Sequence, residues 1–235
     1  MSIAQTLVVS LIFSTLLLAS GCQTAVQTPP QFAESPNGMA ATAHPLATKT
    51  AREVLELGGN AADAAVAAGF VLAVVEPTMN SIGGRSQILV RSGGGDFSAY
   101  NGMTEVPLSY IRPEEAPSNG YGTIATPGAL AALNRLHQEH GTLPLSQLMS
   151  AAVNYAENGF VVLPGESARQ TATLKAIQEN PGFRRSFVRP DGRVAAAGET
   201  LKQEDLASTL RRLATIRSEE RRVGKECRSR WSPYH

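Results

Sequence analysis

The sequence is poor in cysteine, in net charge and in long apolar runs, and each shortage excludes a class of protein. Only two cysteines occur among 235 residues, Cys22 and Cys227, and both lie near the chain ends. The sequence between them therefore offers no disulfide framework. Lysine and arginine (21) nearly balance aspartate and glutamate (20), which leaves a formal net charge of +1. Nothing in that balance indicates a nucleic-acid partner.

The longest apolar run near the start, residues 7–18, is too short to cross a bilayer, which takes about 20 residues. Its length suits the apolar part of a signal peptide. The sequence LASGC that follows resembles a bacterial lipobox, so residues 1–22 are expected to be a lipoprotein signal peptide whose Cys22 carries the lipid. The protein would then be lipid-anchored in a bacterial cell envelope and face the periplasm. No basic residue precedes the run, so an ordinary signal peptide with an incidental cysteine remains the alternative.

Composition divides the rest of the chain into three parts. Residues 23–37 are rich in glutamine, threonine and proline without periodicity, which favours a flexible tether. Residues 38–216 have the patterning of a folded domain. Residues 217–235 hold six basic and three acidic residues with no apolar period, and they resemble a translated sequencing adaptor. A genuine basic tail is the alternative, but it would be the only basic feature of the chain.

Residues 58–90 organise the domain. Gly58 and Gly59 favour the end of a preceding helix, because glycine accepts the left-handed cap conformation. Asn60 is a good N-cap, and Asp63 stands three residues later, where a carboxylate meets the positive end of a helix. Residues 61–75 are almost all apolar and largely alanine. This pattern predicts a helix that neighbours cover on most sides and that ends before Pro77.

A glycine bend and a hairpin follow that helix. Gly83 and Gly84 precede the apolar residues 87–90, where glycine lets the backbone pass close to another group. A second glycine run then leads into residues 97–100, which predicts the second arm of a β-hairpin.

The remaining elements follow from apolar spacing and from proline and glycine positions. We expect a short strand at residues 39–42, loop with weak strand at 184–197, and a helix capped by Thr126. Pro181 is expected to end a helix. His44 is expected to be a core or turn histidine, and His137 and His140 to lie on a solvated face rather than to bind metal. The other predicted helices are residues 47–57, 145–158, 164–179 and 203–214.

Ordered blocks then point to a family. ATAHPLAT at 41–48, GGNAADAAVAA at 58–68, VVEP at 74–77 and SIGG at 81–84 resemble the large-subunit region of the γ-glutamyltransferase family. The resemblance continues through TPGALAALNRLHQEHGTLP at 126–144, AENGF at 156–160 and LASTLRRLA at 206–214, and it covers about residues 38–216.

The resemblance implies a fold and a chemistry. The fold would be an incomplete αββα sandwich of the N-terminal-nucleophile hydrolases, helix-rich α+β, with apolar faces left uncovered. Family enzymes cut themselves and expose a threonine at the start of a small subunit, whose hydroxyl attacks an acyl carbonyl while its own amino group acts as base. No segment here matches the block around that threonine. The chain is therefore expected to hold no catalytic residue, to be inactive alone, and to need no metal or cofactor.

The same resemblance implies substrate-binding positions. Family members carry an arginine that grips the α-carboxylate of a γ-glutamyl group; alignment places Met103 at the arginine position and Thr104 at the following glutamate position. Methionine cannot form the bidentate pair that arginine makes with a carboxylate. Arg85, which interrupts the family's glycine run, either replaces the missing cation or is a structural arginine that bonds loop carbonyls.

The function that the resemblance implies is that of a truncated precursor of an amidohydrolase or acyltransferase of glutathione metabolism. Its partners would be a small-molecule acyl amide, the membrane and the missing small subunit. Two alternatives stay open: an acylase with a preference other than γ-glutamyl, and a non-catalytic periplasmic binding lipoprotein on the same scaffold.

Overall fold

The computed structural model describes residues 34–108, 110–111, 114–115 and 120–215. The chain divides into two units, the second of which starts at Gly38 and holds every element described below. The expected signal peptide with Cys22 lies outside the described residues, as do most of the expected tether and the whole of segment 217–235.

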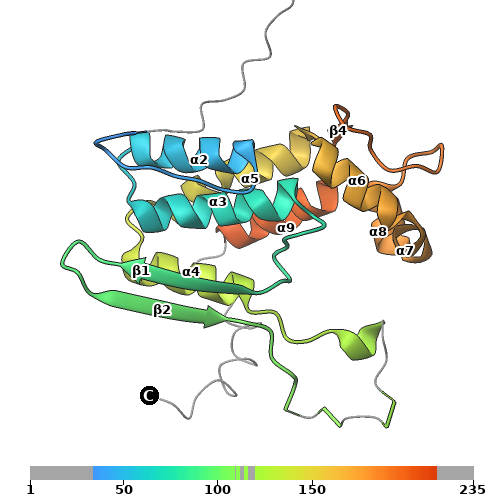
Figure 1. The fold of residues 1–235 in the computed structure, drawn as a ribbon, viewed down its shortest axis with the longest axis horizontal. Coiled ribbons are helices and arrows are strands. Elements are labelled where there is room, and N and C mark those ends of the chain that lie inside the picture. The colour runs from blue at the N-terminus through green and yellow to red at the C-terminus, as the bar shows by residue number, and fades with distance from the viewer. Residues whose placement is uncertain (1–33, 109, 112–113, 116–119, 216–235) are drawn as a thin grey trace, which may run out of the picture. The chain divides into compact units, whose positions relative to one another are not determined.

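Helix α3 (Ala61–Val75) lies at the centre of the fold, as the alanine-rich pattern predicts. It packs against α2 (Pro45–Glu56), α4 (Ala129–His140) and α5 (Leu145–Asn158), and Figure 1 shows it enclosed among them. Most of its side chains are buried, including Phe70 and Val74. Small side chains allow this close approach: a Cβ added at Gly69 would stand 3.1 Å from Leu133 of α4.

The turn between α2 and α3 follows the predicted chemistry. Gly58 has a φ of +88° just after the last turn of α2, a conformation that glycine adopts without strain. Asn60 caps α3: its side chain accepts the N–H of Asp63, and the Asp63 carboxylate accepts the N–H of Asn60 in return. Helix α3 ends at Val75, before Pro77, as predicted.

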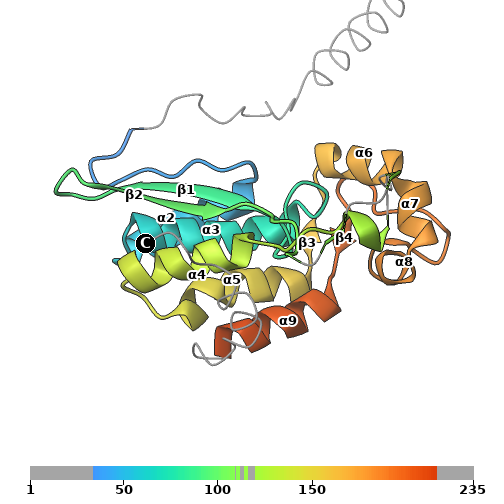
Figure 2. The same ribbon diagram turned by 90° about the horizontal axis from the view of Figure 1, so that it is seen from below.

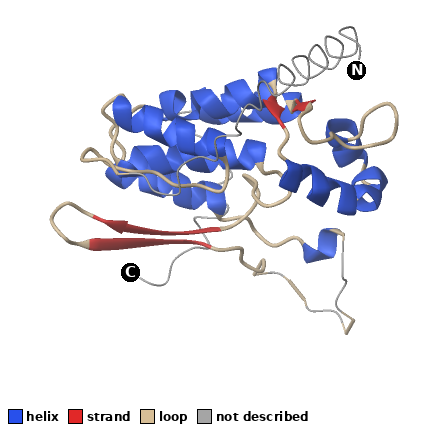
Figure 3. Ribbon diagram, turned by 45° about the horizontal axis from the view of Figure 1, so that its top comes forward, coloured by secondary structure: helices blue, strands red, loops and turns tan. Residues whose placement is uncertain are grey.

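A hairpin runs along one side of the helices, where β1 (Ser86–Arg91) pairs antiparallel with β2 (Phe97–Gly102) (Figures 1 and 3). Alternate residues face α4, and Tyr100 donates its hydroxyl to Glu139 of that helix at 2.6 Å. The opposite face carries Leu89 and Phe97, which are 71% and 66% exposed. The hairpin prediction is confirmed, and its outer face is open among the described residues.

The short helices of the C-terminal part are grouped at one end in Figure 2, and the last helix lies along α5. Helices α6 (Pro164–Ala172), α7 (Leu174–Glu179) and α8 (Pro181–Phe187) follow one another, and α9 (Glu204–Thr215) returns to pack on α5. Between them β3 (Phe160–Val161) pairs with β4 (Thr200–Leu201). The predicted helices at 145–158, 164–179 and 203–214 are confirmed apart from end residues and a break at Thr173.

The expectations for Pro181, for residues 184–197 and for residues 39–42 are wrong. Pro181 begins α8 rather than ending a helix, because Asn180 caps the N–H groups of Gly182 and Phe183 and proline is well placed in a first turn. Residues 184–187 are therefore helical, and 188–197 form a loop without strand. Residues 39–42 form no strand, since no other described segment pairs with them.

Thr126 does not cap α4. It pairs instead with Glu105 in an isolated antiparallel bridge, in which each N–H donates to the other residue's carbonyl (2.8 and 3.1 Å). Gly128, two residues later, takes the N-cap position, so α4 begins at Ala129. In the part of the chain that the structure describes, no helix has the length and apolar character that crossing a bilayer requires.

Candidate functional site

The glycine bend between α3 and β1 rests on the N-terminus of α4. The Gly84 carbonyl accepts the N–H groups of Gly128 and Ala129, both at 3.1 Å. The first N–H groups of a helix have no partner within the helix. The Gly84 carbonyl supplies that partner here, which fixes the bend and the start of α4 to each other. The sequence SIGG is therefore a docking point for α4.

A second close approach fixes the base of the hairpin on the same helix end. A Cβ added at Gly102 would meet the Gly128 carbonyl oxygen at 2.7 Å and the Cβ of Ala132 at 2.6 Å. A Cβ added at Gly128 would meet the Gly102 carbonyl oxygen at 2.5 Å. Any side chain at either position would force the hairpin away from α4.

The predicted substrate-binding residues meet at this end of the hairpin. Ser86 and Gly102 are the last paired residues of the ladder, and Arg85 and Met103 are the next residue outward on each strand. Arg85 is exposed and forms no ion pair or hydrogen bond with the described residues. Met103 and Thr104 are half-buried, and the Met103 N–H donates to Asn101 Oδ1 at 3.2 Å.

A small cavity of about 80 Å³ lies beneath the bend. Its walls come from α3, α4, the bend and the start of β1, and they are apolar except for the side chains of Asn80, Ser81 and Ser86. The Ser86 hydroxyl is buried and has no hydrogen-bond partner among the described residues. Sequence reasoning missed this cavity, because its walls combine segments 60 residues apart.

The N-terminal end of α3 holds a completely buried carboxylate, that of Asp63. Besides capping Asn60, it accepts the Thr142 hydroxyl (2.6 Å), the Thr142 N–H (3.0 Å) and the Leu143 N–H (3.3 Å). Burial alone would raise the pKa of Asp63, but the hydrogen bonds from Thr142, Asn60 and Leu143 outweigh it and lower the pKa. The GGNAAD block thus ties α3 to the turn between α4 and α5.

The opposite end of α3 holds a cluster of charged side chains that sequence reasoning did not single out. Arg169 of α6 pairs with Glu76 and, at 2.9 Å, with Glu166, whose carboxylate is 1% exposed. Thr78 and Gln170 also donate to Glu166, at 2.6 and 2.7 Å. Burial raises the pKa of Glu76; Arg169 opposes that shift and the neighbouring Glu166 adds to it. The available signal was the spacing of Glu166, Arg169 and Gln170 on one helical face.

His44 is the N-cap of α2 and confirms the prediction of a core or turn histidine. It is 2% exposed, and its Nδ1 accepts the Leu46 N–H at 3.1 Å. Nδ1 is therefore the unprotonated nitrogen, and Nε2 carries the proton without a partner. Burial lowers the pKa of His44, and the nearby Glu166 partly opposes the shift.

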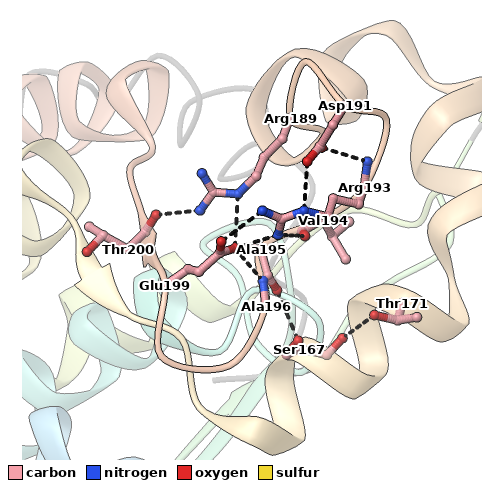
Figure 4. Close-up of polar contacts among 10 residues, drawn as sticks. All are labelled: Ser167, Thr171, Arg189, Asp191, Arg193, Val194, Ala195, Ala196, Glu199 and Thr200. Atoms are coloured by element: carbon pink, nitrogen blue, oxygen red, sulfur yellow. Dashed lines mark hydrogen bonds and ion pairs between the residues drawn. The ribbon is translucent and has the colours of Figure 1, made fainter.

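The loop before β4 is held by a further ion network, drawn in Figure 4. Arg193 forms a double pair with Glu199 (2.6 and 2.8 Å) and contacts Asp191 at 2.8 Å. The Arg193 pair and the Ala196 N–H lower the pKa of Glu199 to about 2. These side chains are half-exposed and close the loop on itself, so we assign them a structural role.

The described residues contain no group of three or more histidine, cysteine, aspartate or glutamate side chains placed to hold a metal ion. His137 and His140 are half-buried rather than solvated: Nε2 of His137 lies 2.8 Å from the Leu143 carbonyl, and the His140 ring packs edge-on to Tyr100. The expectation of a solvated face is wrong, because the hairpin and the α4–α5 turn cover this side of α4.

Comparison with known proteins decides the family. The family model of gamma-glutamyltranspeptidase matches residues 47–220, most of the chain. The chain belongs to the gamma-glutamyltranspeptidase family. Among its relatives are the glutathione hydrolase proenzyme of Pseudomonas sp. (strain A14), 32% identical over 213 residues, and the acylase ACY 1 proenzyme of Pseudomonas sp. (strain SE83), 32% identical over 198 residues. These alignments cover 85% and 77% of this chain.

The solved structures agree. The crystal structure of Helicobacter pylori gamma-glutamyltranspeptidase superposes with a TM-score of 0.75 at 29% identity, covering 78% of this chain and 56% of that chain. The expected fold, an incomplete part of the N-terminal-nucleophile hydrolase sandwich, is confirmed. The chain spans about a third of the length of the curated relatives, 37% and 35% for the two Pseudomonas proteins.

Family membership sharpens the interpretation of the hairpin base. The bend, the open ladder end and the start of α4 form one rigid corner of this gamma-glutamyltranspeptidase-family domain. Arg85 and Met103 leave that corner from adjacent strands.

Proposed function

We propose that this chain forms the large-subunit part of an amidohydrolase or acyltransferase that transfers acyl groups through an N-terminal threonine of a small subunit. The observation that carries the proposal is the family match over residues 47–220, together with the rigid corner that holds the bend against α4. In this proposal the chain supplies part of the acyl-binding wall, and the small subunit supplies the nucleophile.

Reconstitution tests the proposal. Residues 1–235 are co-expressed with the remaining two-thirds of the Pseudomonas glutathione hydrolase proenzyme, and hydrolysis of chromogenic acyl anilides is measured. We expect turnover from the co-expressed pair and none from either part alone. Turnover by the chain alone, or none by an assembled complex, would contradict the proposal.

The acyl donor is proposed to be acidic and to be held by Arg85. This guanidinium is exposed, is unpaired among the described residues and stands next to Met103 at the ladder end. Because methionine offers no charged donor, Arg85 is the cation at this corner that can pair with a carboxylate. Removing one partner of a buried charge pair costs about 2–5 kcal/mol, so a large effect requires that the bound donor and the small subunit desolvate Arg85.

Arg85→Ala in the reconstituted complex is expected to raise KM for a glutaryl or γ-glutamyl anilide by about 10-fold or more. KM for an uncharged acyl anilide of equal length should not change. Arg91→Ala is the matched control, since Arg91 is an exposed arginine at the other end of the same strand. If the two substitutions change KM equally, Arg85 does not bind the donor and its role is structural.

An acylase with a different donor is the second candidate, because the chain is as similar to the acylase ACY 1 proenzyme as to the glutathione hydrolase proenzyme, 32% identical to each. Profiling the reconstituted complex with acetyl, butyryl, glutaryl and γ-glutamyl anilides separates the two. A non-catalytic binding lipoprotein would bind these donors without turning them over.

We propose that the protein is lipid-anchored through Cys22 and faces the periplasm of a bacterial cell. The sequence LASGC after a short apolar run supports this location. Metabolic labelling with a radioactive fatty acid should mark the native chain and not Cys22→Ser. Label retained by Cys22→Ser, or absent from both, would contradict the anchor.

A further inference from the structure

The cavity beneath the glycine bend has the character of a small binding pocket. Phe70 and Ala73 of α3 and Leu130 and Leu133 of α4 line it with apolar groups, and Ile82 of the bend adds another. We infer that it is a subsite for the short aliphatic tail of an acyl amide. This role rests on the proposed function, whereas the binding itself does not depend on turnover.

The size of the cavity sets the length of the tail. Its volume is about 80 Å³, and a water-sized group occupies about 30 Å³ of liquid. The space therefore accommodates about three heavy atoms, the propyl tail of a butyryl group. Drug-sized ligands need pockets of about 300 Å³ or more, so larger ligands are excluded.

The unpaired hydroxyl of Ser86 in the cavity wall limits which ligands can bind. Ser86 Oγ is buried without a hydrogen-bond partner, although buried hydroxyls normally have one. A wholly apolar guest would leave that hydroxyl unsatisfied, and a charged guest would meet mostly apolar walls. A neutral amide with a short alkyl tail supplies the missing hydrogen bond and fills the apolar part.

The position of the subsite connects it to the hairpin base. Ser86 is the first residue of β1 and directly follows Arg85, and Asn80 and Ser81 of the bend line the same cavity. A short acyl tail seated here would bring its carbonyl end to the corner where Arg85 and Met103 leave the ladder.

Binding of a homologous series of amides tests the inference directly. Acetamide, propionamide, butyramide, valeramide and hexanamide are titrated into the full chain with isotope-labelled leucine and isoleucine methyl groups. Each added methylene should tighten binding about 4-fold as far as butyramide, and valeramide should bring no further gain. Shifts should concentrate on the methyls of Ile82, Leu130 and Leu133. Absence of saturable shifts, or tightening through hexanamide, would overturn the inference.

Two variants and a control locate the site. Ala73→Leu fills the cavity and should abolish butyramide binding, whereas Ala65→Leu makes the same change at an exposed position of α3 and should leave it intact. Ser86→Ala keeps the cavity and should weaken binding about 5-fold, because one hydrogen bond is lost. If Ala73→Leu fails to fold, Ser86→Val provides the filled cavity instead. Unchanged butyramide binding in the filled variant overturns the inference.

The outcome separates the subsite from the proposed function. Amide binding by the chain without turnover in the reconstituted complex would contradict the proposed function and keep the subsite. Turnover without saturable amide binding would do the reverse. A Ser86 hydroxyl that ordered water satisfies, with no amide bound, also overturns the subsite.

Discussion

The two ends of α3 both hold buried carboxylates, and they hold them by different means. At the N-terminal end, neutral N–H and hydroxyl donors surround Asp63, and its pKa falls. At the C-terminal end, Glu76 lies close to a second carboxylate, Glu166, and shares Arg169 with it, and its pKa rises. The same chemical group is thus favoured in its charged form at one end and disfavoured at the other.

The difference follows from the polarity of the helix and from the neighbours. The first turn of a helix presents N–H groups to an acceptor, and its positive end favours a negative charge. The last turn presents carbonyls, so a carboxylate there depends on a cation brought by another element, here α6. The Asp63 end is completed by backbone donors, and the Glu76 end by a single side chain.

The largest expected effect is at Asp63. Asp63→Asn replaces an acceptor of several donors with a group whose NH₂ faces those donors, and it should lower the free energy of unfolding by about 3 kcal/mol. Urea denaturation at pH 7 measures the loss. Glu53→Gln, an acid-to-amide change in the exposed pair with Lys49, should cost less than about 0.5 kcal/mol.

The acid dependence of that loss checks its cause. A carboxylate with a lowered pKa stabilises the fold above its ordinary pKa of 3.8, and this stabilisation is lost as pH falls through its folded pKa. The loss in Asp63→Asn should therefore shrink toward pH 3. If the stability difference between the native chain and Asp63→Asn does not change with pH, the charge of Asp63 is not what stabilises the N-terminal end of α3.

The next effect is at Arg169, whose side chain is 37% exposed and therefore partly screened by water. Arg169→Ala leaves two adjacent carboxylates without a cation and should cost about 2 kcal/mol at pH 8. The raised folded pKa of the Glu76 carboxyl stabilises the fold at pH values below 4.5, its ordinary pKa. This stabilisation is lost as the pH rises through the folded pKa. The cost should consequently be smaller at pH 5. Arg52→Ala, which breaks the exposed pair with Glu56, should show little loss and no such trend.

A smaller effect is expected at His44, beside the Glu76 end. Its lowered pKa means that it stabilises the fold above its ordinary value of 6.5, and that this contribution is lost as pH falls through the folded pKa. Between pH 7 and pH 5 the native chain should lose on the order of 1 kcal/mol for this reason. His44→Asn keeps a capping side chain and should remove that slope in thermal melts. A variant that tracks the native pH profile would assign the slope elsewhere.

The smallest effect is expected at Glu199, whose carboxyl titrates at a pKa of about 2 although it lies in a half-exposed loop. Glu199→Gln should leave the urea midpoint unchanged within error, because solvent screens exposed pairs. Carbon NMR titration of the native side chain checks the pKa. A clear shift of the midpoint would show that loop closure, as well as burial, makes a carboxylate matter to stability.

Local chemistry explains why much of α3 and of the hairpin could be predicted from sequence. Asn60, Asp63 and Pro77 bound the helix through contacts within a few residues, and the observed helix, Ala61–Val75, agrees with the prediction. The prediction of a strand at residues 39–42 was wrong, because a strand needs a partner strand and sequence spacing does not show whether one is present. The prediction that Thr126 caps α4 was wrong, because its backbone groups pair instead with Glu105, 21 residues earlier.

The candidate site was predictable to a similar degree. Arg85 and Met103 are brought to one corner by hairpin register, which the glycine turn and the alternating strands indicate. The i, i+3, i+4 spacing indicated a cluster around Glu166, but its burial was not predictable, because a glutamate in a polar helix normally faces solvent. One of its partners, Thr78, lies 88 residues earlier in the chain.

The Asp63 contacts can form only late in the synthesis of the chain. The donors on Thr142 come 79 residues after the carboxylate that they serve. At a translation rate of about 5–20 residues per second, the ribosome needs roughly 4–16 seconds to deliver them. During that interval the nascent helix has only its local capping box, and the Asp63 carboxylate lacks the donors of Thr142.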